Sequence, residues 1–202
     1  MKGLILKDLM NLKKQAYIYL ALVLFYAVFA LVYKNSSFFG GMLCILSAMT
    51  PITAMAYDER ANWDKYALTM PVSRRDIVLS RYLLGLLCAT AAFVLLVLFQ
   101  TLIPYKEEGM WNVSLIFYAI SIVYISLLLP ILFWLGVEKG RLLMMLFLLI
   151  PILIGFLAPN IDLSALDAQN LLQIVYAFPI FVAVLFLLSL FLSLRIYQRK
   201  EL

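Results

Sequence analysis

The chain has 202 residues, of which 66% are hydrophobic and only 13% charged, and its formal net charge is +5. Soluble domains carry about 25% charged residues, so the composition excludes an ordinary soluble protein and indicates a membrane protein. Histidine is absent, and Cys44 and Cys88 lie within apolar runs. The sequence therefore predicts no catalytic residue, no cofactor-binding or metal site and no disulfide framework in this chain.

Apolar runs long enough to cross a bilayer follow one another along the chain. A helix that crosses the hydrocarbon core needs about 20 apolar residues, and it satisfies its own backbone hydrogen bonds there. The sequence thus predicts an all-α, polytopic membrane protein with six transmembrane helices, folded as a single transmembrane domain over residues 1–202. The predicted spans are 16–33, 38–57, 80–104, 112–135, 142–158 and 172–194.

The first fifteen residues, MKGLILKDLMNLKKQ, loosely follow a helical period. Ile5, Leu9 and Leu12 share one face, opposite a face with Lys7 and Lys14. Such a pattern is typical of an interfacial helix lying along the inner leaflet of the lipid bilayer. An ordinary basic flank of the first span is the simpler alternative, and we favour the helix.

A dense polar stretch at residues 58–76 separates the second and third spans. Trp63, Tyr66, Ala67 and Met70 recur at helical spacing, which predicts a short helix with an aromatic face. Pro71 disfavours helical geometry at the residue before it and ends this helix. The chain is therefore expected to turn sharply here, between two helices.

The third span is predicted to begin outside the membrane. Ser73 and Asp76 form an S-x-x-[DE] capping box that starts a helix. About 30 residues from there to the end of the span give roughly 45 Å of helix, more than the hydrocarbon thickness of about 30 Å. The protruding end would carry Arg74, Arg75 and Arg81.

This polar stretch has the residue types of a protein interface. Aromatic residues and arginine are enriched as interface anchors. The alternative is a helix whose Trp63 and Tyr66 merely lie among lipid headgroups. Acidic residues such as Asp58, Glu59 and Asp64 would be repelled by anionic lipid, so a cytoplasmic protein partner is the better interpretation.

The predicted spans contain few groups for ion chemistry. No Asp, Glu, Lys or Arg lies in the middle of a span, which disfavours an ion-coupled transporter. Small residues, including Gly85 and Ala89, form a surface on the third span that permits close helix contact. Either a dimer seam or an internal contact would explain this surface.

The distribution of basic residues predicts the orientation. All but Lys34 and Lys106 of the 16 Lys and Arg residues flank the spans on one side, which the positive-inside rule makes cytoplasmic. Both termini are then cytoplasmic, with residues 195–202 as a tail, and the basic charge needs no nucleic acid partner. The sequence contains no GxxxxGK[ST], so ATP would have to be used by another chain.

The six spans, the start LILKDLMNLKKQ and the stretch YDERANWDKYALTMPVSRRDIVLSRYL at 57–83 resemble permease subunits of bacterial ABC-2 type exporters. The chain is most similar to small permeases such as the membrane subunits of phenol-soluble modulin exporters, and PVSRRDI is the part that carries most of this resemblance.

The resemblance implies a multi-pass protein of the bacterial cytoplasmic membrane, paired with a second permease copy. It also implies a coupling helix at 59–70 that docks on a separate ATP-binding subunit holding ATP and Mg. The implied docking residues are Asp58, Glu59, Trp63, Asp64, Lys65, Tyr66, Met70, Pro71, Arg74 and Arg75.

The sequence is therefore compatible with two alternative functions, which belong to different classes of protein. The first is a permease subunit of an ATP-driven exporter that moves a hydrophobic or amphipathic peptide, lipid or drug. The second is a membrane scaffold or immunity protein that docks a cytoplasmic partner without transport. Co-purification with an ATP-binding subunit, followed by transport measurements, discriminates between them.

Overall fold

The computed structural model describes residues 2–13, 15–67, 73–103, 110–140, 142–143 and 168–199. All regular secondary structure in these ranges is helical, which confirms the all-α class. The helices are α1 (Lys2–Lys13), α2 (Ala16–Tyr33), α3 (Ser36–Arg60), α4 (Trp63–Ala67), α5 (Arg74–Leu102), α6 (Met110–Leu135) and α8 (Ala168–Arg199).

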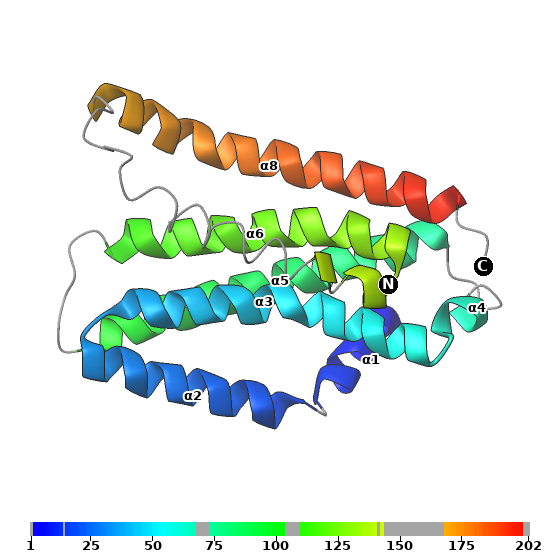
Figure 1. The fold of residues 1–202 in the computed structure, drawn as a ribbon, viewed down its shortest axis with the longest axis horizontal. Helices are drawn as coiled ribbons and strands as arrows, with labels where there is room; N and C mark the ends of the chain where they lie inside the picture. The colour runs from blue at the N-terminus through cyan, green and yellow to red at the C-terminus, as the bar shows by residue number, and fades with distance from the viewer. Residues whose placement is uncertain are drawn as a thin grey trace.

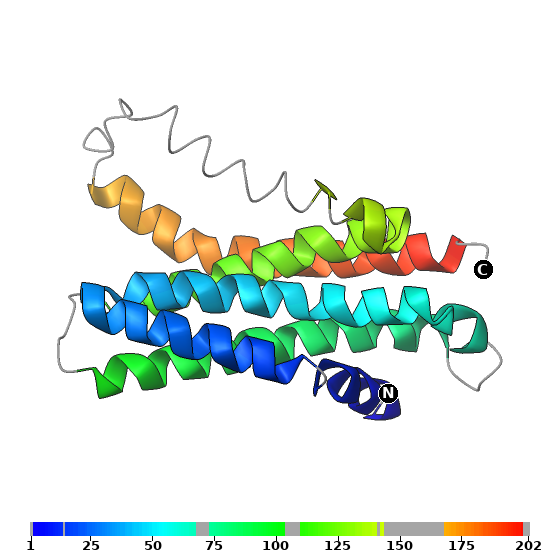
Figure 2. The ribbon, with the colours of Figure 1, turned by 60° about the horizontal axis from the view of Figure 1, so that its bottom comes forward.

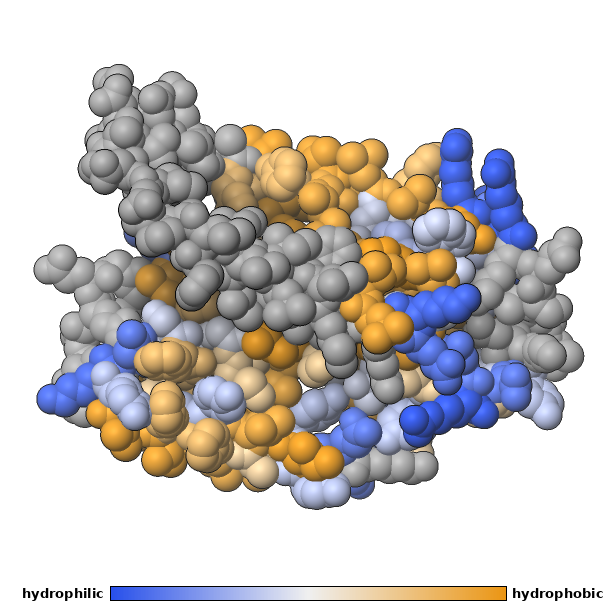
Figure 3. Space-filling model, viewed as in Figure 1, coloured by the Kyte–Doolittle hydropathy of each residue, from blue (hydrophilic) through white to orange (hydrophobic). Residues whose placement is uncertain are grey.

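The five long helices lie side by side along one axis (Figures 1 and 2). Helix α3 contacts α2, α5 and α6, while α8 packs on α5 and α6. Short helices α1 and α4 lie at the same end of this bundle as the last turn of α8 (Figure 1). Hydrophilic side chains gather at that end, beside a predominantly apolar middle (Figure 3).

Five helices are long and apolar enough to cross a membrane, and they correspond to the first four predicted spans and the sixth. Their bounds are Ala16–Tyr33, Ser36–Arg60, Arg74–Leu102, Trp111–Leu135 and Phe178–Arg199. The fifth predicted span, at 142–158, lies almost entirely outside the described residues. A sixth crossing therefore stays a prediction.

Helix α5 begins where the sequence predicts. The Ser73 side chain accepts a hydrogen bond from the Asp76 backbone N–H, and the Asp76 carboxylate accepts one from the Ser73 N–H, which completes the capping box. The helix has 29 residues, or about 44 Å at about 1.5 Å per residue. It is thus longer than a hydrocarbon core of about 30 Å, as the sequence predicts.

Small residues let α3 and α5 approach α6 closely. A Cβ atom added to Gly85 would lie 3.1 Å from Ile125, and one added to Gly40 would lie 2.6 Å from the Phe117 ring. Ala89 is also buried. Gly85 and Ala89 of the small-residue surface are therefore internal packing contacts in this chain.

Hydroxyl groups tie the helices together inside the bundle. The Tyr82 hydroxyl on α5 lies 2.6 Å from Ser189 Oγ and 2.8 Å from Ser193 Oγ, both on α8. Ser189 Oγ also donates to the backbone oxygen of Ser126 on α6. These buried bonds hold α5, α6 and α8 at the end of the bundle that carries α4.

Candidate functional site

Four charged side chains meet where α1 crosses the ends of α3 and α5, and we call them the buried charge cluster: Lys7, Asp8, Asp58 and Arg81. Lys7 Nζ lies 2.7 Å from each carboxylate oxygen of Asp58 and 3.4 Å from Asp8 Oδ1. Arg81 Nη1 lies 2.5 Å from Asp8 Oδ2, and Arg81 Nη2 pairs with Asp58. The side chains of Asp8 and Arg81 are only 1% and 4% exposed.

The cluster is electrically balanced, because two cations face two carboxylates. Buried ions lose hydration that their partners must replace, so removal of one member of a buried pair costs about 3–5 kcal/mol. Balance does not itself make the cluster stabilising, since well-packed apolar residues can replace an ion pair at no cost. What the cluster does provide is a connection between α1 and the ends of α3 and α5.

Helix α4 rests on this cluster through Trp63. Lys7 Nζ lies 4.3 Å from the centroid of the Trp63 ring, a cation–π contact worth about 0.5–2 kcal/mol. Trp63 is half-buried against the hydrophobic core and Ala67 is fully buried. Tyr66 points outward with 62% of its surface exposed. The predicted aromatic face is thus divided, because Trp63 packs α4 against the bundle while the Tyr66 side chain is exposed at the surface.

The other predicted docking residues have different surroundings. Glu59 at the end of α3 and Arg75 at the start of α5 are exposed, whereas Asp58 belongs to the buried charge cluster. Arg74 Nη1 donates to the Gln198 carbonyl oxygen at 2.8 Å, at the end of α8 where carbonyls lack helical partners. Asp64 and Lys65 are part of α4, and Met70 and Pro71 lie outside the described residues.

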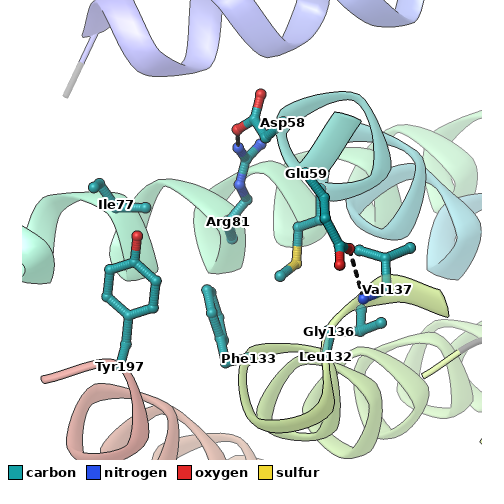
Figure 4. A pocket seen from close by; sticks show the side chains of 10 residues that line it. Asp58, Glu59, Ile77, Arg81, Leu132, Phe133, Gly136, Val137 and Tyr197 are labelled. Atoms are coloured by element: carbon teal, nitrogen blue, oxygen red, sulfur yellow. Dashed lines mark hydrogen bonds and ion pairs between the residues drawn. The ribbon is translucent and has the colours of Figure 1, made fainter. Parts of the chain in front are cut away.

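A cavity of about 70 Å³ adjoins the cluster between α3, α5, α6 and α8 (Figure 4). Its lining consists of Met55, Asp58, Glu59, Ile77, Arg81, Leu132, Phe133, Gly136, Val137 and Tyr197. Glu59 Oε2 accepts a hydrogen bond from the Val137 N–H at 2.8 Å, across a turn in which Gly136 has a φ of 81°. Pockets for drug-sized ligands measure about 300–1,000 Å³, so this space suits a few water molecules.

Helix α1 exists as predicted, but its faces differ from the predicted ones. Leu12 is buried against α3 and α5, and Ile5 is half-buried. Leu9 is 48% exposed and lies on an outward apolar face with Leu6 and Met10. The expected stripe of Ile5, Leu9 and Leu12 is therefore split, because Asp8 and Leu12 turn toward the bundle. An interfacial position of α1 stays a prediction.

Helices of membrane length, with a braced short helix and charged side chains at one end, define a multi-pass helical membrane protein. The chain belongs to the ABC-2 family transporter proteins, because the model of that family matches residues 3–198. No curated protein and no solved structure is significantly similar to the chain.

Family membership confirms the coarser part of the sequence-based interpretation. The protein is a membrane component of an ABC-2 family transporter. Such components generally work with an ATP-binding partner subunit, and they typically lack an ATPase domain of their own.

Proposed function

We propose that the protein is the permease subunit of an ATP-driven exporter and that α4 is its coupling helix. The end of the bundle with α1, α4 and the last turn of α8 would face the cytoplasm of a bacterial cell, as the distribution of basic residues favours. A separate subunit would bind ATP and Mg. The observation that carries the proposal is the exposed Tyr66 on a short helix seated firmly on the bundle.

The surroundings of α4 suit a protein partner. Tyr66 lies close in the chain to exposed residues of both signs, with Glu59 and Arg60 before it and Arg75 after it. Interface anchors are commonly aromatic residues and arginine, surrounded by a polar rim. Since the chain runs from α3 through α4 to the long helix α5, a displacement of α4 by the ATP-binding subunit would act on the ends of two transmembrane helices.

The proposed cargo is a hydrophobic or amphipathic molecule, such as a peptide, lipid or drug. An amphipathic peptide of the phenol-soluble modulin type is the first cargo to test, because the sequence resembles permeases for such peptides. We further propose a sixth span at 142–158 and the pairing of two permease copies around the pathway.

Co-expression with an ATP-binding subunit encoded beside this chain tests the docking. Tyr66→Ala is expected to abolish co-purification while leaving membrane insertion intact. Tyr17→Ala is the matched control, because Tyr17 on α2 is also largely exposed, at 71%. A complex retained by Tyr66→Ala, and by the double variant Trp63→Ala with Tyr66→Ala, contradicts the docking assignment.

Transport is a separate measurement on the intact complex. Inside-out vesicles are expected to accumulate an amphipathic peptide when ATP is supplied, and the peptide is expected to stimulate ATP hydrolysis. A complex that forms but neither takes up peptide, lipid or drug probes nor changes its hydrolysis in their presence would be a scaffold.

A further inference from the structure

The buried charge cluster lies between the proposed coupling helix and the transmembrane bundle. Lys7 contacts Asp58 on α3, Asp8 on α1 and the Trp63 ring on α4. Arg81 on α5 completes the cluster by pairing with both carboxylates. One connected set of side chains thus joins α1, α3, α4 and α5.

Helix α1 is connected to α4 by side-chain contacts and not by the adjacent backbone. Helices α3, α4 and α5 are consecutive in the chain, so a displacement of α4 reaches α3 and α5 through the backbone. Helix α1 has no such link to α4. Besides the cluster, the packing of Leu12 with Ala54 and Leu84 holds α1 against α3 and α5.

We propose that α1 is a moving part of the transporter, clamped by Asp8 and Arg81 so that a displacement of α4 is passed through the cluster to α1. This inference rests on the proposed docking of α4 on an ATP-binding subunit. Asp8 and Arg81 are positioning residues, which act through α1 and touch neither nucleotide nor cargo. The outward face of α1, with Leu6, Leu9 and Met10 exposed, would carry the movement to the surrounding lipid.

The perturbation that removes the clamp between Asp8 and Arg81 is the double variant Asp8→Leu with Arg81→Met, which leaves the contacts of Lys7 with Asp58 and Trp63 in place. It removes one anion and one cation together, so Lys7 and Asp58 remain as a balanced pair at 2.7 Å. Replacement of a whole buried ion pair by apolar residues is often neutral for folding. The exposed Tyr66 surface is untouched, so co-purification with the ATP-binding subunit should be retained.

The movement of α1 can be followed by a distance between two spin labels. Labels are attached through Met10→Cys on α1 and Leu188→Cys on α8, two exposed positions, after Cys44→Ser and Cys88→Ser. The full chain is studied with its ATP-binding subunit in lipid nanodiscs, without nucleotide and then with ATP plus vanadate. Nucleotide is expected to shift the distance in the parent protein. In the double variant the shifted fraction should fall on the order of fivefold or more.

Two controls separate positioning from simple stability. Lys13→Gln removes an exposed charge from the same helix and should leave the shift unchanged. Arg81→Lys keeps the positive charge and should restore most of the shift that the double variant loses.

The outcomes distinguish this inference from the proposed function. A parent complex that forms without a nucleotide-dependent shift overturns the inference and leaves docking intact. A stably folded double variant that keeps the full shift also overturns it. If the parent chain binds no ATP-binding subunit, the proposed function fails, and the inference falls with it.

Discussion

Replacement of Arg81 by methionine is the most direct test of the buried charge cluster. Arg81 pairs with Asp8 at 2.5 Å and also with Asp58, and its side chain is 4% exposed. Without Arg81, two buried carboxylates share the single ammonium of Lys7. The single variant should therefore be much less stable than the double variant that also replaces Asp8.

The size of the effect follows from the imbalance of charge. Removal of one partner from a buried ion pair costs about 3–5 kcal/mol. For a chain of this size, each kcal/mol corresponds to about 2–4 °C in melting temperature. Arg81→Met is thus expected to lower the apparent Tm by on the order of 10 °C, whereas Arg81→Met with Asp8→Leu should recover most of this loss.

The two native cysteines provide the assay. Cys44 is buried and Cys88 half-buried within α3 and α5, so a thiol-reactive fluorophore reports unfolding as the detergent-solubilised protein is heated. Arg75→Met, at an exposed position of the same helix, is the matched control and should change Tm little. If Arg81→Met melts with the parent protein, or if the double variant is no more stable than Arg81→Met, the charge balance is not what holds α1 in place.

Three further predictions concern the bundle and α1. Tyr82→Phe should destabilise the protein by about 1–2 kcal/mol in the same thermal assay, because two serine hydroxyls of α8 lose a partner; an unchanged Tm would contradict this. Gly40→Ala should be clearly destabilising, since the added Cβ would lie 2.6 Å from the Phe117 ring. Gly41→Ala should be tolerated, because its added Cβ would lie 3.8 Å from the nearest atom. Equal effects of the two variants on Tm would refute the close contact between α3 and α6. A fluorophore on Met10→Cys should be quenched by brominated lipid more strongly than one on Leu12→Cys, because Met10 is 64% and Leu12 only 8% exposed; the reverse order would place the outward face of α1 away from lipid.

Local signals predicted much of the helix pattern. Five of the six predicted spans match helices of membrane length, because an apolar run of sufficient length is a property of contiguous sequence. The capping box of Ser73 and Asp76 also formed as predicted, since its hydrogen bonds join residues three apart. The ABC-2 resemblance, carried by residues 57–83, was confirmed by the family match over 3–198.

The candidate site was only partly predictable. Trp63 and Tyr66 were both expected to face a partner, but Trp63 is half-buried against the core while Tyr66 is exposed. Helical spacing shows that two residues share a face, and it does not show which neighbour that face meets. Asp8 was missed as a site residue, although a lone acidic residue among apolar and basic ones at the start of the chain was a signal for a buried partner.

The sequence by itself determined which segments are helical and long enough to cross a membrane, because backbone hydrogen bonding and bilayer thickness act on contiguous residues. Only the tertiary structure decided that Lys7, Asp8, Asp58 and Arg81 meet in one cluster. Their pairing depends on where α1 crosses α3 and α5, and that crossing is set by side chains distant in the chain packing together.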